Sequence, residues 1–222
     1  TVAVRMPNHP VALTLIRLLS EPIAAPSANR SGRPSPTHAE YVRRDLGKDV
    51  DMILDGGMCH IGIESTVIDM STDIPCILRA GTITVDMIQA TIGQIMSHNS
   101  ANELIEPKSP GMQPRHYAPN FKIIPVSPDT WPQTLDKWRK VDKPIGILCH
   151  RTTVQDGSVA FYRHIPGTDE EYGKGLFAAF LDAETVNVAI LLVETVKEQG
   201  VGIAIMDRIH RAQAIERDNL DE

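Results

Sequence analysis

Residues 24–37 carry the densest set of chemically useful side chains in this sequence, including three serines, an asparagine, a glycine and two arginines. This segment lies between a short apolar run and a helical pattern that starts near Pro36. Free backbone amides at a helix N-terminus attract anions, and Arg30 and Arg33 would add planar donors for phosphate or carboxylate. The segment therefore predicts an anion-binding loop. The alternative is an ordinary loop in which Ser35 or Thr37 only caps the helix, and Thr37 with Glu40 fits a capping box.

Three other polar groups stand at the ends of expected strands. Arg5 closes an alternating pattern over residues 1–6, and Arg79 closes an apolar run over residues 76–79. The polar triplet of residues 64–66 opens a run rich in β-branched residues. Strand ends are where α/β sheets collect functional groups, so these positions are candidates for the same site.

The elements that must position these groups follow from hydrophobic periodicity and turn residues. In the first half of the chain we expect strands over residues 1–6, 22–25, 50–54, 62–69 and 76–79, and helices over 11–19, 36–46 and 85–96, the last capped by Thr84. In the second half we expect strands over residues 121–126, 145–149, 159–162 and 201–206, and helices from 128 through Trp138 and over 176–181, 186–199 and 209–217. This alternation predicts a second α/β domain with a largely parallel sheet, to which we assign no nucleotide because it has neither a G-x-G-x-x-G motif nor a P-loop.

Residues 97–120 have no periodicity and the composition of a linker. Within them, residues 109–119 hold an arginine, a histidine and a tyrosine between prolines, with no acid. Stiffened loops of this kind often act as lids, so we expect a lid function here.

Composition limits the protein classes that fit. The sequence has 42% hydrophobic and 23% charged residues, with neither a membrane-length apolar run nor a signal-peptide pattern. Its three cysteines and scattered histidines lack metal-ligand spacing, which predicts no protein-built metal site and suits a reducing cytoplasm. The net charge of −6 argues against a general nucleic-acid binder, while residues 1–44 hold six arginines against two acids, consistent with a focused anion pocket. The sequence opens on Thr1 inside a strand pattern, so we expect that an N-terminal part of the first domain is missing.

Taken together, several motifs resemble the threonylcarbamoyl-AMP synthases of the YrdC-domain superfamily, in the long form with an extra C-terminal domain. The matching motifs, in chain order, are Arg5-Met6-Pro7, Ala25-Pro26-Ser27-Ala28-Asn29, Pro34-Ser35-Pro36-Thr37, Asp55-Gly56-Gly57, Gly62-Ile63-Glu64-Ser65-Thr66-Val67, Ile77-Leu78-Arg79-Ala80-Gly81, Ser109-Pro110-Gly111-Met112 and Arg115-His116-Tyr117-Ala118-Pro119. The resemblance implies an α/β fold: a mixed, twisted, open-sheet YrdC-like domain over residues 1–98, incomplete at its N-terminus. A linker and lid over 99–120 and a smaller Rossmann-like three-layer α/β domain over 121–222 would follow.

The resemblance also implies an activity: L-threonine, bicarbonate and ATP are joined into threonylcarbamoyl-adenylate with release of pyrophosphate. Other enzymes then transfer the threonylcarbamoyl group to the tRNA adenosine beside the anticodon. Carried over by motif, the threonine-binding residues would be Arg5, the carbonyl of Ala25, and Ser65. The ATP-binding residues would be Thr1, Ser27, Ser35, Arg79 and Tyr117, with Asn29 a further pocket candidate. Catalysis would then come from positioning by Arg5, Ser27, Ser65 and Arg79, with Mg²⁺ accompanying ATP.

The sequence departs from the family pattern at its N-terminal end, because the family's lysine- and arginine-rich phosphate-binding segment is absent and residues 1–44 contain no lysine. We therefore expect this polypeptide alone to be weak or inactive. Two alternatives to a synthase remain open: an RNA-binding module, which would contact tRNA weakly, and a regulatory or docking fragment without catalysis of its own. The expected partners are the small substrates and the downstream tRNA threonylcarbamoyl transferase machinery, without a membrane.

Overall fold

The computed structural model describes residues 1–97, 116–154 and 156–213 of the chain. Its helices are α1 (Pro10–Leu19), α2 (Ala39–Leu46), α3 (Val85–Ile92), α4 (Trp131–Trp138), α5 (Asp169–Thr185) and α6 (Val201–Gln213), with a 3-10 turn, η1 (Pro128–Thr130), before α4. Its strands are β1 (Val67–Asp69), β2 (Cys76–Arg79), β3 (Met96–Ser97), β4 (Lys122–Val126), β5 (Ile145–Cys149), β6 (Phe161–His164) and β7 (Ile190–Glu194). These strands form two separate sheets.

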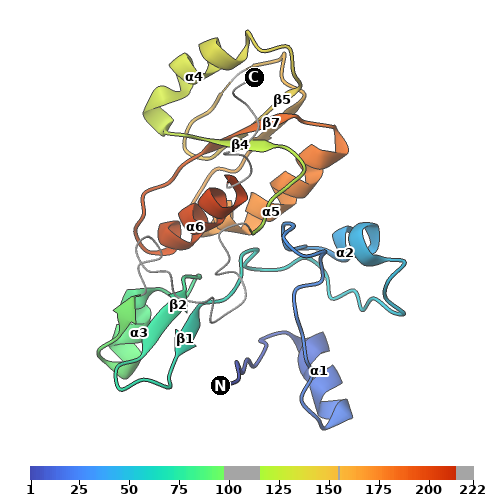
Figure 1. Cartoon of the computed structure of the whole chain (residues 1–222), viewed down its shortest axis with the longest axis vertical. Coiled ribbons are helices and arrows are strands. Elements are labelled where there is room, and N and C mark those ends of the chain that lie inside the picture. Colours follow the sequence, from blue (N-terminus) through green and yellow to red (C-terminus); the bar gives the residue numbers. More distant parts are fainter. Residues whose placement is uncertain (98–115, 155, 214–222) are drawn as a thin grey trace.

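The larger sheet has the order β4-β7-β5-β6, and every neighbouring pair in it is parallel. Helices α5 and α6 cover one face and α4 covers the other, so the region has three layers (Figure 1). Strands β5 and β7 are buried along their whole length, as expected for central parallel strands with both faces covered. The expected Rossmann-like three-layer domain with a parallel sheet is confirmed.

The smaller sheet is mixed: β1 pairs antiparallel with β2, and β2 pairs parallel with β3. Helix α3 packs on it through a small apolar core of Ile77, Ile88 and Ile95. The Thr84 hydroxyl caps α3 by accepting from the amide of Met87, as predicted, but the helix ends at Ile92 rather than at residue 96. Mixed α/β structure is therefore confirmed for this half as well.

Two predicted elements near the C-terminus are wrong. The expected helix over residues 186–199 contains β7, and the expected strand over 201–206 is the first half of α6, which continues through the predicted helix start at 209. The apolar run of β7 is buried on both faces and has no amphipathic period, so its type could not be read from the pattern. In α6 the buried residues Val201, Ala204, Ile205 and Ile209 follow helical spacing.

The strands expected over residues 1–6, 22–25 and 50–54 are also absent, although all of these residues belong to the described part of the chain. Val2, Val4 and Met6 are 83%, 89% and 82% exposed. A strand needs a neighbour for its backbone hydrogen bonds, and the described residues provide none there. The strand expected over 62–69 is confined to β1.

Neither Ser35 nor Thr37 caps α2. The helix begins at Ala39, and the side chain of its N-cap residue, His38, accepts a hydrogen bond from the amide of Glu40. Thr37 is buried, and its carbonyl accepts from the amide of Cys59. The Ser35 hydroxyl is thereby free to make a contact outside the helix.

Candidate functional site

The loop of residues 26–37 is held by its own polar groups. Asn29 Nδ2 donates to the carbonyls of Arg30 and Arg33, at 2.9 and 3.1 Å. The two arginines expected to attract an anion are already paired, because Arg30 lies 2.7 Å from Asp49 and Arg33 lies 2.7 Å from Glu184. In this structure both guanidinium groups thus have carboxylate partners, and their service as anion donors stays a prediction.

The Ser35 hydroxyl donates to Glu64 Oε1 at 2.6 Å, and Glu64 Oε2 accepts from Arg208 Nε at 3.1 Å. Glu64 thus links the predicted loop to helix α6 of the parallel-sheet region. Arg208 also donates to the main-chain carbonyl of Glu64 at 3.4 Å and to Asp207 at 2.9 Å. Its side chain is fully buried, so the charge depends on these acceptors.

Arg79, at the end of β2, donates through Nε to the carbonyl of Ser65 at 3.1 Å. The approach of these two segments is close: a Cβ on Gly81 would clash with the amide nitrogen of Thr66. Glycine is therefore required at position 81. The end of β2 and the start of the β1 segment consequently lie together, as their strand-end positions predicted.

Tyr117 is fully buried, although the sequence placed it in a linker. Its ring packs on Phe177 of α5 at 5.2 Å between centroids, and the Arg208 guanidinium lies 5.5 Å from its ring centroid. Its φ of 64° is in the left-handed region. This conformation costs a non-glycine residue energy and persists only where the surrounding structure imposes it. Packing from two helices holds Tyr117 in place.

Burial and charge shift the pKa values of this group. Burial, followed by the charge of Glu64, raises the pKa of Tyr117 to about 12. Burial lowers the pKa of Arg79, partly offset by Tyr117 and Glu64. For Arg208, burial opposes the charged form, but Glu64, Tyr117 and Asp207 outweigh it and raise the pKa. Burial also lowers the pKa of His116, which favours its neutral form near pH 7.

The structure thus brings together Ser35, Ser65, Arg79 and Tyr117, and we call these four residues with Glu64 and Arg208 the Glu64 cluster. Thr1, Arg5, Ala25 and Ser27 are exposed, and within the described ranges no hydrogen bond or ion pair joins them to it. Asn29 is half-buried in its own turn. Glu64 was expected at the site only as part of the polar triplet of residues 64–66, and Arg208 was not expected there. A helical period over residues 201–209 was the available signal for Arg208.

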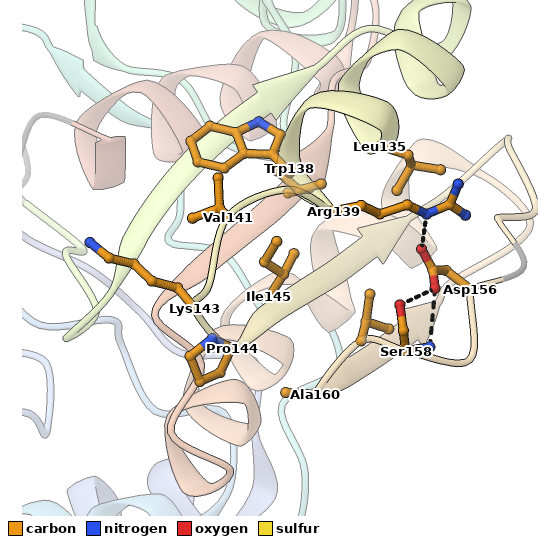
Figure 2. A pocket seen from close by; sticks show the side chains of 12 residues that line it. Leu135, Trp138, Arg139, Val141, Lys143, Pro144, Ile145, Asp156, Ser158 and Ala160 are labelled. Carbon is orange, nitrogen blue, oxygen red and sulfur yellow. Dashed lines mark hydrogen bonds and ion pairs between the residues drawn. The ribbon is translucent and has the colours of Figure 1, made fainter.

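A separate hollow of about 260 Å³ lies between α4 and the edge of the larger sheet (Figure 2). Apolar side chains and Trp138 line it, and at its rim Arg139 pairs with Asp156 at 2.8 Å. Residues of the Glu64 cluster do not line it. The hollow is therefore no part of the candidate site.

The described residues hold neither a metal-binding group nor a membrane span. Among them, no three His, Cys, Asp or Glu side chains are grouped to hold a metal ion. The described helices include none with the length and apolar character for crossing a bilayer. All three cysteines are free thiols.

Two family models together match almost the whole chain. A Sua5/YciO/YrdC model described as "Telomere recombination" matches residues 1–81, and a model described as "Threonylcarbamoyl-AMP synthase, C-terminal domain" matches residues 83–214. The fold and these matches define a two-part α/β protein of the Sua5 type. The chain belongs to the threonylcarbamoyl-AMP synthase family, in its long form.

Curated relatives and solved structures agree with this assignment. Threonylcarbamoyl-AMP synthases from Pyrococcus abyssi and Bacillus subtilis are 39% and 40% identical over 96% of this chain, covering 64% and 63% of their own lengths. A crystal structure of P. abyssi Sua5 with L-threonine superposes with a TM-score of 0.87 at 38% identity, over 96% of this chain and 64% of that one. A P. abyssi Sua5 variant with an adjacent histidine and tyrosine changed to alanine gives 0.86 at 36% identity, over 96% of this chain and 62% of that one. The chain therefore spans somewhat less than two thirds of these relatives.

Proposed function

We propose that this chain belongs to an enzyme that makes L-threonylcarbamoyl-adenylate from L-threonine, bicarbonate and ATP, releasing pyrophosphate. The product would serve threonylcarbamoyl modification of the tRNA adenosine next to the anticodon. The observation that carries the proposal is the similarity to curated threonylcarbamoyl-AMP synthases over 96% of the chain. The Glu64 cluster supports it, because it places Arg79 and two serines from separate elements in one group.

In this mechanism the amine of threonine first adds to the carbon of bicarbonate, and loss of water leaves a carbamate. A carbamate oxygen then attacks the α-phosphorus of ATP, and pyrophosphate leaves. Each step brings anions together, so positioning and charge neutralisation supply most of the catalysis. Arg79, whose Nε is held against the Ser65 carbonyl, would bring a positive charge towards the phosphates.

We assign the binding residues as the sequence motifs suggest. Threonine would be held by Arg5, the carbonyl of Ala25, and Ser65. ATP would be held by Thr1, Ser27, Ser35, Arg79 and Tyr117, with Asn29 adjoining the pocket. Because Thr1, Arg5, Ala25 and Ser27 are exposed and outside the Glu64 cluster, we propose that this polypeptide alone is weakly active or inactive.

Magnesium does not fit the described residues as a protein-held ion. Glu64, the carboxylate central to the cluster, already accepts from Ser35 and Arg208. Magnesium would therefore arrive with the ATP phosphates, which need few protein ligands.

We also propose a domain organisation and a cellular location for the chain. The catalytic domain would comprise residues 1–98, the linker and lid 99–120, and the C-terminal domain 121–222; residues 99–115 of the linker lie outside the described residues. The enzyme would act in the cytoplasm and pass its product to the tRNA threonylcarbamoyl transferase machinery, with at most weak tRNA contact of its own.

Calorimetric titration with ATP and with L-threonine tests the binding assignment, and mass spectrometry of the bicarbonate-dependent product tests the chemistry. We expect measurable binding of both ligands and slow formation of threonylcarbamoyl-adenylate. Rapid release of pyrophosphate with all three substrates would overturn the proposal of weak activity. Failure to bind either ligand would overturn the synthase itself, because even an inactive polypeptide with the proposed site should bind them.

A further inference from the structure

Arg208 stands out among the arginines of the described ranges because its side chain is fully buried while its charge is retained. A buried guanidinium is costly unless acceptors surround it, and breaking one such pair typically leaves an uncompensated charge. Here the acceptors are Glu64, through both its side chain and its backbone, and the neighbouring Asp207. The bond between Arg208 and Glu64 joins residues 144 positions apart.

The contacts of Arg208 with Glu64 and Tyr117 lead to residues proposed to bind substrate. The carboxylate of Glu64 also accepts from the Ser35 hydroxyl at 2.6 Å, and its backbone leads directly into Ser65. The guanidinium also lies over the Tyr117 ring, at 5.5 Å from the centroid. One side chain of α6 therefore contacts both the residue bonded to Ser35 and the ring of Tyr117.

Other bonds between the two halves of the chain lack this property. Tyr41 of α2 donates to Asp182 of α5 at 2.7 Å, and Arg44 donates to the carbonyl of Leu181 at 3.1 Å. Both join the same regions, but neither involves a member of the Glu64 cluster. In Figure 1 α5 and α6 lie between the larger sheet and the N-terminal segments. The bonds of Tyr41 and Arg44 and those of Arg208 therefore belong to one interface. A position in this interface therefore does not by itself account for the contacts that Arg208 makes with members of the Glu64 cluster.

We propose that Arg208 is a positioning residue for the synthase site. From the C-terminal domain it fixes Glu64 and the Tyr117 ring, and through them the placement of Ser35 and Ser65. We assign it no contact with substrate, because its guanidinium nitrogens already donate to Glu64 and Asp207. This inference rests on the proposed function for the identity of the ligands, and it assigns the C-terminal domain a direct contribution to ligand binding.

The test compares Arg208→Gln, Arg208→Lys and the control Tyr41→Phe in the full chain. We expect Arg208→Gln to weaken ATP binding by about tenfold, the scale of one lost charge-assisted bond. Arg208→Lys should recover part of this, because it keeps the charge beside Glu64 but cannot reach the carboxylate and the carbonyl together. Tyr41→Phe removes an interface bond and should lower the unfolding midpoint while leaving ATP affinity within about twofold. Equal ATP affinity in Arg208→Gln and Tyr41→Phe would overturn the proposal.

Hydrogen exchange supplies a readout that does not depend on ligands. In Arg208→Gln, amide exchange should rise in residues 63–66 and 117–118, while Tyr41→Phe should leave these segments protected. A uniform rise over the chain, or no local change, would contradict positioning by Arg208. Should Arg208→Gln not fold, Glu64→Gln removes the same charge pair and is held to the same outcomes. If the unmodified chain binds neither ATP nor threonine, the proposed function fails, while the exchange data still decide what Arg208 holds in place.

Discussion

The backbone amide of Ala118 donates a hydrogen bond to the carbonyl of Gly32, with 2.7 Å between nitrogen and oxygen. Two further bonds reinforce this junction: Arg33 donates to Asn120 Oδ1 at 3.0 Å, and the Asn120 amide donates to Glu184 at 2.9 Å. The end of the linker is thus bonded both to the serine-rich loop and to α5. A change in the serine-rich loop or in α5 would therefore alter the position of Tyr117.

Tyr117→Ala should weaken ATP binding and also lower stability. The ring is fully buried against Phe177, so its removal leaves a cavity worth about 3 kcal/mol or more. Urea unfolding with and without ATP separates the two effects. Tyr117→Phe is the matched control, since it keeps the ring and should retain most of the stability. ATP affinity unchanged in both variants would remove Tyr117 from the nucleotide site.

Arg5→Ala should reduce L-threonine affinity more than ATP affinity, because Arg5 is assigned to the amino-acid carboxylate. The side chain is exposed, so we expect little change in unfolding free energy. Calorimetric titration of each ligand measures the difference, with the exposed Arg17→Ala as the control. Equal losses for both ligands would refute this assignment.

The four tyrosines should remain protonated well above their ordinary pKa of about 10. Burial is the main cause in each case; it raises the pKa of Tyr41, Tyr117 and Tyr162 to about 12 and that of Tyr172 well above 10. Because the folded pKa values are raised, their stabilising contribution is complete below pH 10 and is lost as the pH rises towards 12. Absorbance at the phenolate band should show almost no ionised tyrosine at pH 10 in the native protein and half ionisation in denaturant. A native midpoint near pH 10 would contradict the burial of Tyr117 and Tyr172, which are fully buried.

Asp156 should stabilise the fold only above acidic pH. Hydrogen bonds from Ser158 and then Arg139 lower its pKa to about 2. The depressed value means that the contribution is present above pH 4 and is lost as the pH falls towards 2. The difference in melting temperature between the unmodified chain and Asp156→Asn should therefore shrink between pH 5 and about pH 2. A difference independent of pH would show that the charge is not responsible.

Glu194→Ala should strongly destabilise the parallel-sheet region. The fully buried carboxylate accepts from Trp131 Nε1 at 3.2 Å and from the backbone amides of His150, Arg151 and Thr152 at 2.9–3.2 Å. Removing it leaves several buried donors unsatisfied, at a cost of about 3 kcal/mol or more. Denaturant unfolding measures this, and Glu194→Gln should give an intermediate loss because one oxygen remains.

The sequence predicted most of the parallel-sheet region because its signals are local. Residues 145–149 are apolar and bounded by turn residues, and β5 begins and ends there. In the smaller-sheet half of the chain, Thr84 likewise precedes a predicted helix, and its hydroxyl caps α3. By contrast, residues 1–6 alternate as a strand should but find no neighbour among the described residues, and pattern alone cannot supply one.

In the candidate site, too, the residues found by local motifs differ from those that depend on contacts between distant segments. Ser35, Ser65, Arg79 and Tyr117 were suggested by motifs of the resembling family and lie in or beside one hydrogen-bonded cluster. The pairing of Glu64 with Arg208 could not be foreseen, because it depends on how two distant segments fold together. Arg30 and Arg33 looked suited to an anion, yet the carboxylates that neutralise them come from elsewhere in the chain.

Strand β7, the last strand of the larger sheet to be synthesised, lies between β4 and β5 and pairs with both. A nascent polypeptide that stopped before Ile190 would hold two strand edges with nothing between them. The sheet can therefore close only once residue 194 has left the ribosome, and α6 can pack onto it only afterwards. Arg208 is the last member of the Glu64 cluster to be synthesised, so the cluster can assemble only after translation has passed this residue.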